Sequence, residues 1–279
     1  MKKACVIGWP ITHSRSPIIH NYWLKKYNIV GTYERISVEP ENLKSFIDNL
    51  SRNGFVGCNV TIPHKETALS LVQNLDEIVV STGSLNTIYL IGGEVHATST
   101  DGEGFSKNLL STLPNYSLRD KNIILIGAGG SAKAIIDNLL RQSIRHVKIF
   151  NRTVERAQQI KQQFGTRVKI GNPIPNQIDL EECDLLINTT PQGMAGQRPN
   201  DLDISSLPPT AIVADIVYVP LKTELIKRAE SQGLRTVTGL GMLLHQAVRG
   251  FELWFGVRPA VTPELYELVA RNINPDYEA

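Results

Sequence analysis

Two patterns of hydrophobic and polar positions alternate along the first half of the chain. Short apolar runs predict strands, and segments with apolar residues three or four positions apart predict helices. The predicted strands are "ACVIG", "TYERISV" and "FVGCNVT". The predicted helices are "IIHNYWLKKY", "ENLKSFIDNLSRNG", which ends at Gly54, and "KETALSLV". Ser16 and Pro17 predict the start of the first helix, as an N-cap followed by a first-turn proline.

The second half repeats this alternation more regularly. The first half closes with a predicted hairpin, in which "SLNTIYL" and "EVHAT" are joined at Gly92-Gly93. The later predicted strands are "KNIILIG", "HVKIF", "CDLLINTT" and "AIVADIV". The later predicted helices are "GSAKAIIDNLLRQ", "VERAQQIKQQF", "GMLLHQAVRGFELWF" and "PELYELVARNI". Alternation of strands and helices favours an α/β protein with a parallel, doubly wound sheet.

The length and composition favour two domains. The chain has 279 residues, of which 42% are hydrophobic and 20% are charged, a balance typical of globular proteins. Two medium-sized domains are a better expectation for this length than one large domain. Turn residues in "STLPNYSLRD" predict a boundary within residues 101–120. We therefore expect an N-terminal α/β domain over 1–103, a nucleotide-binding domain over 104–238 and C-terminal helices over 239–279.

Charge and cysteine content exclude several classes of protein. A net charge of +2 and a pI near 8.4 are too mild to indicate a nucleic-acid surface. The three cysteines, Cys5, Cys58 and Cys183, are far apart in apolar stretches, which favours buried thiols over a disulfide. The six histidines have no metal-ligand spacing, so we expect no metal. Neither a signal peptide nor a membrane-length apolar run is present, so we expect a cytoplasmic protein.

A glycine-rich motif follows one predicted strand and opens a helix. In "IILIGAGGSAKAI", Gly127, Gly129 and Ala132 fit the pattern G-x-G-x-x-[GA]. The first glycine permits a tight turn, the second lets the backbone approach a pyrophosphate, and the small third residue lets helix and strand pack. A tight turn between a strand and a helix needs glycine even without a ligand. The surrounding strands and helix nevertheless favour a dinucleotide site of the Rossmann type.

The end of the next predicted strand favours NADP(H) over NAD(H). "HVKIF" runs into Asn151, Arg152 and Thr153, where an NAD-binding protein usually has a carboxylate for the ribose. Arg156 lies four residues after Arg152 and can face the same corner if a helix starts near Thr153. A guanidinium suits a 2′-phosphate because its planar fork makes two charge-assisted bonds. The alternative is that both arginines are solvated surface charges.

Polar residues also gather in the first half, where predicted strands end. Alternation in "NVTIPHK" puts Val60 and Ile62 on a buried face and Asn59 and Thr61 on the other, before Pro63 ends the strand. We expect Lys65 in the first turn of the next helix. Comparable segments hold Ser14, Ser16, Asn86 and Asp101. Each residue taken singly can be a cap, a turn residue or an exposed charge.

Nine segments together resemble the shikimate dehydrogenase family. They are "HSRSPIIHN", "GCNVTIPHK", "GSLNTI", "STDGEGF", "IGAGGSAKA", "NRTVERA", "NTTPQGM", "DIVYVPLKT" and "GLGMLLHQAVRGFELWFG", in the family's order. The match spans essentially the whole chain. It implies a two-domain α/β oxidoreductase, with C-terminal helices that return to the first domain and a Rossmann-like second domain. The family interconverts 3-dehydroshikimate and shikimate with NADPH in aromatic amino-acid biosynthesis.

The resemblance also implies roles for individual residues. Lys65 and Asp101 match the catalytic pair. The implied substrate-binding residues are Ser14 and Ser16 for the carboxylate, Thr61, Asn86 and Gln246 for the ring hydroxyls, and Asn59 and Tyr218 on the pocket wall. The implied NADP(H)-binding residues are Gly127, Gly129, Gly130, Ser131, Ala132, Asn151, Arg152, Thr153, Arg156, Thr189, Ile216 and Gly239. Partners would be a small-molecule substrate, without nucleic acid or membrane, in a monomer or homodimer.

Two departures from the family pattern and two alternatives qualify this interpretation. Ser99 and Val219 stand where members commonly have asparagine, which bears on the shape of the pocket. One alternative is a relative that acts on quinate or an aminated analogue, with NAD as a possible cofactor. The other is a nucleotide-binding regulator without catalysis, which the intact Lys65 and Asp101 disfavour. In the favoured mechanism, protonated Lys65 donates to the carbonyl oxygen and Asp101 holds the ammonium.

Overall fold

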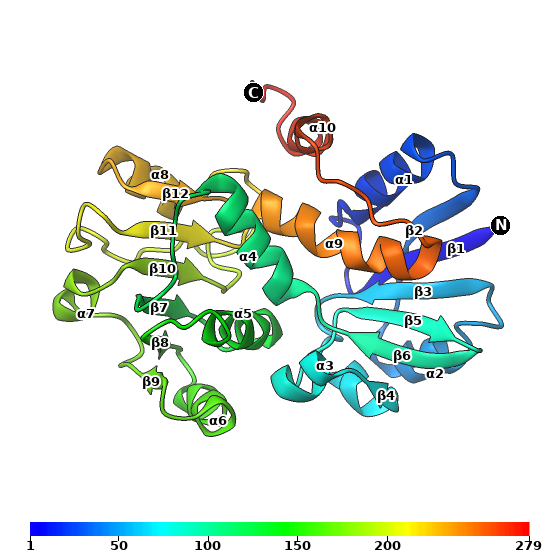
Figure 1. Ribbon diagram of the computed structural model, residues 1–279, viewed down its shortest axis with the longest axis horizontal. Helices are drawn as coiled ribbons and strands as arrows, with labels where there is room; N and C mark the ends of the chain where they lie inside the picture. Colours follow the sequence, from blue (N-terminus) through cyan, green and yellow to red (C-terminus); the bar gives the residue numbers. More distant parts are fainter. Residues whose placement is uncertain (279) are drawn as a thin grey trace. The chain divides into compact units, whose positions relative to one another are not determined.

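The computed structural model describes residues 1–278, except for the side chain of Ile178, and divides into two compact units (Figure 1). The first unit comprises residues 1–101 and 244–269, and the second comprises residues 102–243 and the residues from 270 onward. Each unit has its own six-stranded sheet. The predicted two-domain α/β fold is therefore confirmed.

The sheet of the first unit combines parallel and antiparallel strands. Strand β1 pairs in parallel with β2 and β3, whereas β5 pairs antiparallel with β3 and β6. The predicted hairpin joins β5 and β6, where Gly92 and Gly93 have φ values of 59° and 89° that favour glycine. In spatial order the strands are β2 (Gly31–Ser37), β1 (Lys2–Gly8), β3 (Phe55–Val60), β5 (Thr87–Ile91), β6 (Glu94–Thr98) and β4 (Asn74–Leu75).

Several predicted helix boundaries in this unit were wrong. Helix α1 (Ser16–Lys26) has Arg15 at its N-cap, so Ser16 is its first residue. The next helical segment is η1 (Pro40–Asn42) followed by α2 (Leu43–Asp48), which ends before Gly54. "KETALSLV" forms only the 3₁₀ helix η2 (Thr67–Leu71). There the Ser70 hydroxyl donates to the Thr67 carbonyl, a local bond that competes with α-helix formation.

The end of β3 also differs from the prediction. The strand stops at Val60, and the chain turns at once, with the His64 amide donating to the Thr61 carbonyl at 2.9 Å. Val60 is buried as expected, but Ile62 is 67% exposed because strand alternation no longer applies after the turn. Lys65 consequently lies in this turn, before η2 begins.

The C-terminal helices return to the first unit, as predicted. They are α9 (Gly239–Phe255), from residue 244 onward, and most of α10 (Pro263–Ile273). The Trp254 indole on α9 donates to the Ile88 carbonyl of β5 at 2.9 Å. Gly57 makes room for this indole, because a Cβ at position 57 would collide with Trp254 Nε1. The Trp23 indole of α1 donates to the Ala260 carbonyl at 3.1 Å.

The sheet of the second unit is wholly parallel. Its order from β9 to β12 is 3-2-1-4-5-6, the order of dinucleotide-binding folds. Alternate residues of β7 face two cores, so that Ile123 and Leu125 belong to one cluster and Ile124 to the other. In spatial order the strands are β9 (Val168–Ile170), β8 (His146–Phe150), β7 (Asn122–Ile126), β10 (Leu185–Asn188), β11 (Ile212–Asp215) and β12 (Arg235–Val237).

Helices supply both cores of this unit. Helices α4 (Asp101–Thr112), α5 (Gly130–Leu140) and α6 (Val154–Phe164) contribute to the cluster around Leu125. Helices α7 (Gln177–Glu181) and α8 (Glu224–Ser231) contribute to the cluster around Ile124. Helices α3 (Glu77–Thr82), α4, α7 and α8 were not predicted from the sequence. Among the described residues, no helix is long and apolar enough to cross a membrane.

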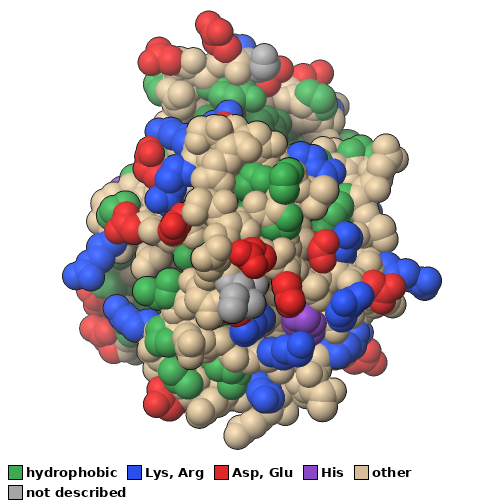
Figure 2. All heavy atoms as spheres, turned by 90° about the vertical axis from the view of Figure 1, so that its left-hand side faces the viewer, with side chains coloured by type: hydrophobic (Ala, Val, Ile, Leu, Met, Phe, Trp, Pro, Cys, Tyr) green, Lys and Arg blue, Asp and Glu red, His purple; other side chains and the backbone are tan. Residues whose placement is uncertain are grey.

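Cationic side chains gather at the N-terminal ends of β7, β8 and β9. A cavity of about 560 Å³ there is lined by Arg145, His146, Arg167 and Lys169, together with Asn122, Thr166 and Glu182. Figure 2 shows Lys and Arg side chains clustered around a histidine on one face of the molecule, with acidic side chains beside them. The cluster lies at the edge opposite to the C-terminal strand ends, where dinucleotide-binding folds hold their ligand.

Candidate active site

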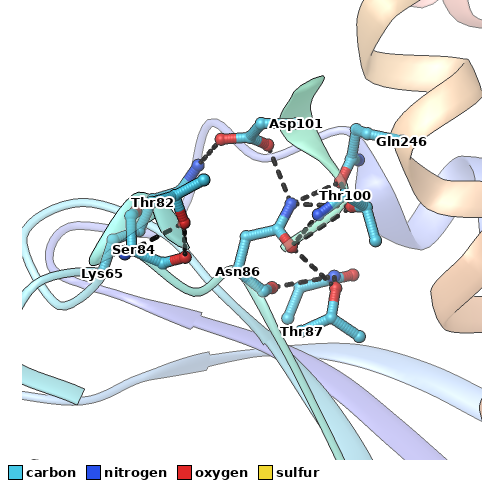
Figure 3. A network of polar contacts seen from close by, with 9 residues as sticks. Lys65, Thr82, Ser84, Asn86, Thr87, Thr100, Asp101 and Gln246 are labelled. Atoms are coloured by element: carbon cyan, nitrogen blue, oxygen red, sulfur yellow. Dashed lines mark hydrogen bonds and ion pairs between the residues drawn. The ribbon is translucent and has the colours of Figure 1, made fainter. Parts of the chain in front are cut away.

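An ion pair joins Lys65 to Asp101 in the first unit (Figure 3). Lys65 Nζ bonds to Asp101 Oδ2, and their side chains are only 17% and 7% exposed. Lys65 comes from the turn after β3, and Asp101 follows β6 as the first residue of α4. The structure thus brings together the two residues predicted to form the catalytic pair. Their burial distinguishes them from exposed ion pairs, in which water weakens the interaction.

Asn86 holds the other oxygen of this carboxylate. It lies just before β5 and is 3% exposed. Its Nδ2 donates to Asp101 Oδ1 and to Thr100 Oγ1, both at 2.8 Å. Its Oδ1 accepts from the Thr100 amide at 2.9 Å. The carboxylate therefore has a separate donor for each oxygen, an arrangement that stabilises its ionised form.

Gln246 on α9 completes this polar cluster. Its Oε1 lies 3.3 Å from Asn86 Nδ2 and 3.4 Å from Thr100 Oγ1. The Asn86 amide has only two hydrogens for three nearby acceptors, and Gln246 is the most distant of them. Gln246 is therefore the weakest partner of the Asn86 amide. Thr100 was not predicted from the sequence. The only sequence feature that points to it is its position directly before Asp101.

Of the predicted carboxylate-binding serines, Ser14 lies on the loop after β1 and Ser16 is the first residue of α1. The Ser16 amide donates to Ser14 Oγ at 3.3 Å, and Arg35 Nε donates to the Ser14 carbonyl at 2.7 Å. Thr61 bonds to β1 through its amide, which donates to the Ile7 carbonyl at 3.0 Å. Gly8 permits this approach, since a Cβ there would lie 2.7 Å from Thr61 Cγ2.

Asn59 is buried, as Asn86 and Ser16 are. It is 5% exposed, and its Oδ1 accepts a 2.6 Å hydrogen bond from the Tyr33 hydroxyl. Its Nδ2 donates to the Asn86 carbonyl and to Thr87 Oγ1, both at 3.1 Å. Both amide hydrogens of Asn59 are therefore bonded inside the protein. Neither Tyr33 nor Thr87 was predicted from the sequence.

The glycine-rich loop of the second unit has the features that its motif requires. Gly127 has a φ of 113°, and a Cβ there would lie 2.5 Å from Thr189 Oγ1. The Gly127 amide donates to the Phe150 carbonyl at 2.9 Å, which brings the loop beside the end of β8. A Cβ at Gly129 would meet nothing within 4 Å. Open space therefore faces the position where a phosphate has to approach.

The predicted adenosine-phosphate residues follow β8. Arg152 and Arg156 are both exposed, and neither has a hydrogen bond or an ion pair to any other residue that the structure describes. The Asn151 side chain donates to the Thr153 carbonyl at 2.7 Å and so shapes the turn before α6. Two unpaired guanidinium groups near an open glycine loop fit a phosphate-bearing ligand.

The predicted nicotinamide-flanking residues lie at the C-terminal ends of β10, β11 and β12. Thr189 Oγ1 donates to the Ile126 carbonyl at 2.7 Å, and the Ile216 amide donates to the Asn188 carbonyl at 3.1 Å. A Cβ at Gly239 would collide with the Ile216 carbonyl. Tyr218, predicted to line the substrate pocket, is half-buried on the loop after β11 and belongs to the second unit.

A buried polar cluster supports these loops and was not predicted from the sequence. Asp215 Oδ1 accepts from Asn188 Nδ2 at 2.9 Å and from the Val217 amide at 3.0 Å. Asp215 Oδ2 accepts from Thr223 Oγ1 at 2.7 Å. Burial raises the pKa of Asp215, whereas these three donors lower it. The carboxylate thereby links the end of β10 to the loop that carries Tyr218.

Comparisons with known proteins agree with this geometry. Residues 6–88 match the shikimate dehydrogenase substrate binding domain. Residues 109–195 match the shikimate / quinate 5-dehydrogenase family, and residues 239–263 match the shikimate 5'-dehydrogenase C-terminal domain. The three matches follow one another along both units.

Whole-chain relatives extend these matches. The shikimate dehydrogenase (NADP(+)) of Nitrobacter hamburgensis is 48% identical over 100% of this chain and 97% of its own length. A Rhodopseudomonas palustris protein of the same name is 50% identical over 97% and 96%.

Solved structures are also similar. A shikimate dehydrogenase in complex with NADP+ has a TM-score of 0.88 and 34% identity, covering 98% of this chain and 96% of its own. A Thermus thermophilus shikimate 5-dehydrogenase with NADP(H) and shikimate has a TM-score of 0.86 and 30% identity, covering 98% and 100%. A Corynebacterium glutamicum quinate dehydrogenase with NAD has a TM-score of 0.87 and 28% identity, covering 96% and 99%. The chain therefore belongs to the shikimate dehydrogenase family.

Proposed function

We propose that this protein catalyses the reversible, NADPH-dependent reduction of 3-dehydroshikimate to shikimate, with Lys65 as general acid and base and Asp101 as its partner. Family membership makes the chain an oxidoreductase with NADP(H) as its cofactor. The observation that carries the residue roles is the buried Lys65–Asp101 ion pair, whose carboxylate also accepts from Asn86. A buried lysine with a fixed carboxylate partner is suited to proton transfer.

The reduction needs a hydride at carbon and a proton at oxygen. NADPH supplies the hydride when it is bound. Lys65 donates a proton from its ammonium to the carbonyl oxygen as negative charge develops there. Asp101 keeps the ammonium in place. In the reverse direction neutral Lys65 accepts the proton of the shikimate hydroxyl, so oxidation is favoured by higher pH.

The substrate is held by the polar residues around this pair. Ser14, on the loop after β1, and Ser16, at the start of α1, offer hydroxyl groups to the substrate carboxylate. Thr61, Asn86 and Gln246 hold the ring hydroxyls, and Gln246 exchanges its long contacts for one to the substrate. Tyr218, on the loop after β11, is a further substrate-binding residue.

The second unit holds NADP(H). The backbone of residues 127–132 takes the pyrophosphate, and Gly129 leaves the open space that this requires. Arg152 and Arg156 hold the 2′-phosphate, on a turn shaped by Asn151 and Thr153. Thr189, Ile216 and Gly239 flank the nicotinamide.

The alternative substrate and cofactor pair is quinate with NAD. The quinate dehydrogenase with NAD has the same fold at 28% identity. The chain has no carboxylate among Asn151, Arg152 and Thr153, which disfavours NAD, because NAD-binding proteins usually hold the ribose with an acidic residue there. We therefore propose shikimate and NADP(H), in a cytoplasmic protein that is a monomer or a homodimer.

A dehydrogenase assay tests this proposal directly. The purified full chain is mixed with shikimate or quinate and with NADP+ or NAD+, and formation of reduced cofactor is followed. We expect the highest kcat/KM with shikimate and NADP+. A Lys65→Met variant should bind shikimate but not turn it over. Absence of turnover with every pair, despite NADP+ binding, would instead indicate a nucleotide-binding regulator.

A further inference from the structure

A continuous chain of hydrogen bonds connects the interior of the first unit to the Lys65–Asp101 pair. It runs from the Tyr33 hydroxyl to Asn59, on to Thr87, then to Asn86, and ends at the Asp101 carboxylate. Tyr33, Asn59, Thr87 and Asn86 are at most 5% exposed. Water therefore cannot readily replace a lost member of the chain.

The backbone fixes the orientation of the Asn59 amide. The Asn86 carbonyl can only accept hydrogen bonds, so the Asn59 group 3.1 Å away has to be Nδ2. Asn59 Oδ1 then faces Tyr33, which has to donate its hydroxyl hydrogen. Burial raises the pKa of Tyr33 well above its usual range, so this hydroxyl stays protonated. The ring stacks on His20, with 4.0 Å between centroids, which holds the phenol in place.

The orientation of the Asn86 amide is fixed in the same way. The Thr100 backbone amide can only donate, so the Asn86 atom 2.9 Å away has to be Oδ1. Thr87 Oγ1 accepts from Asn59 and directs its own hydrogen to the same Oδ1, at 3.0 Å. Asn86 Nδ2 is thereby turned toward Asp101 as a donor. A reversed amide would put an oxygen against the carboxylate.

We propose that Tyr33, Asn59 and Thr87 are positioning residues that lock the Asn86 amide with its Nδ2 toward Asp101. The lock keeps one carboxylate oxygen occupied by Asn86 and aims the other at Lys65. It deepens the proposed function, because it rests on Lys65 and Asp101 as the reacting pair. It also gives Asn59 a role inside the protein, in place of the direct substrate contact that the resemblance implied.

Thr87 allows the most direct test, because valine has nearly the shape of threonine but lacks the hydroxyl. Thr87→Val deletes the link between Asn59 and Asn86, and Thr87→Ser keeps it. Thr98→Val is the matched control. Thr98 pairs with Thr87 across β5 and β6 and is 6% exposed, and its hydroxyl has no hydrogen bond within residues 1–278.

We expect Thr87→Val to lower kcat for shikimate oxidation about fivefold, because one buried hydrogen bond contributes on the order of 1 kcal/mol. The KM for NADP+ should stay unchanged. Thr87→Ser should recover most of the kcat, and Thr98→Val should match the wild type. A Thr87→Val enzyme with wild-type kcat would overturn the proposal, whereas loss of kcat in Thr98→Val to the same extent would show a merely structural effect.

A second measurement tests how firmly the Asn86 amide is held and does not depend on catalysis. Hydrogen exchange of the Asn86 side-chain amide, followed by NMR in the substrate-free protein, should become faster in Thr87→Val but not in Thr98→Val. Equal exchange in all three proteins would refute the lock even if the protein has no dehydrogenase activity. If the wild type oxidises shikimate and Lys65→Met does not, but Thr87→Val is normal in both measurements, the lock fails while the proposed function stands.

Discussion

Lys65 and Asp101 form an ion pair that is largely removed from water, with side-chain exposures of 17% and 7%. The reduction direction uses the ammonium and the oxidation direction uses the neutral amine. We therefore expect the oxidative kcat to rise with pH. Lys65→Ala should lower kcat in both directions by about 10²- to 10⁴-fold, the usual contribution of a general acid or base.

The matched control is Lys107→Ala, which removes an exposed lysine that pairs with Glu103 on α4. Its activity and pH profile should equal those of the wild type, as expected for a surface pair. Near-normal kcat in Lys65→Ala at all pH values would exclude the proposed proton transfer.

Replacement of Gly127 by alanine should affect stability, whereas replacement of Gly129 should affect cofactor binding. Gly127→Ala forces a φ of 113° on a non-glycine residue and presses a methyl group on Thr189, so it should cost about 2 kcal/mol or more in unfolding free energy. Gly129→Ala meets no protein atom and should leave stability within about 0.5 kcal/mol. Its methyl group should instead weaken NADP+ binding. Thermal unfolding and NADP+ titration of both variants separate the two effects, and an unchanged NADP+ affinity in Gly129→Ala would contradict the proposed phosphate path.

Arg152 and Arg156 should determine the choice of cofactor. Each guanidinium has no protein partner among residues 1–278, so its removal disturbs little else. Arg152→Ala and Arg156→Ala should each raise the KM for NADP+ about tenfold or more, since charge-assisted bonds contribute roughly 1.5–3 kcal/mol. The KM for NAD+ should hardly change. Lys161→Ala, near the other end of α6, serves as the control, and equal losses with both cofactors would argue against a 2′-phosphate contact.

His20 should make the protein less stable in acid. Burial lowers the pKa of His20 from 6.5 to about 3, so the unfolded chain binds a proton between these values and the folded chain does not. The free energy of unfolding therefore falls as the pH drops below 6.5, by about 3 kcal/mol from this residue alone at pH near 4.5. His20→Phe should remove this part of the acid sensitivity.

Urea unfolding at neutral and acid pH measures the difference. The phenylalanine ring suits the site, because His20 lies among Trp23, Tyr33, Phe251 and Trp254 and its ring nitrogens have no hydrogen-bond partner in the described residues. The exposed His13→Gln serves as the control. If His20→Phe loses as much stability in acid as the wild type, the buried neutral imidazole is not the cause.

The cationic cavity of the second unit should respond to salt. Partial burial and the charges of Lys169 and Arg145 lower the pKa of His146. Raising the ionic strength from roughly 0.01 M to 0.5 M shortens the Debye length from about 30 Å to a few ångströms, so the pKa should rise toward its usual value. Lys169→Ala should raise it at low salt, and Lys227→Ala on α8 should not. NMR titration of the imidazole shows whether the neighbouring charges act as stated.

Elements with a clear period were predicted well from the sequence, whereas several short elements and the twelve-residue helix α4 were missed. The bounds of β8 and α6 agree with "HVKIF" and "VERAQQIKQQF", because each element has a clear period and ends at turn residues. Helix α8 was missed, although Thr223 caps it by accepting from the Ile226 amide. Its eight residues gave too short an apolar pattern to stand out.

The contacts among the site residues could not be predicted from their spacing in the sequence. Alternation put Asn59 and Thr61 on one face of β3, but it could not name the partners of Asn59. Those partners follow from the strand order β2-β1-β3-β5, which brings Tyr33 and Thr87 to the same residue from opposite directions along the chain. The family resemblance identified Lys65 and Asp101 as a pair. The contacts of Tyr33 and Thr87 with Asn59 are evident only from the structure.

Two main-chain groups beside the β5–β6 hairpin bear on the evolution and the design of this site. The Asn86 carbonyl and the Thr100 amide, which each hold one of the two asparagine side chains, are groups that no point substitution can delete, short of proline at position 100. A descendant that keeps this hairpin therefore keeps these two backbone contacts, and the side chains of Tyr33, Asn59 and Thr87 supply the rest of the lock. A design that transfers only the side chains to another scaffold would lose these two backbone contacts.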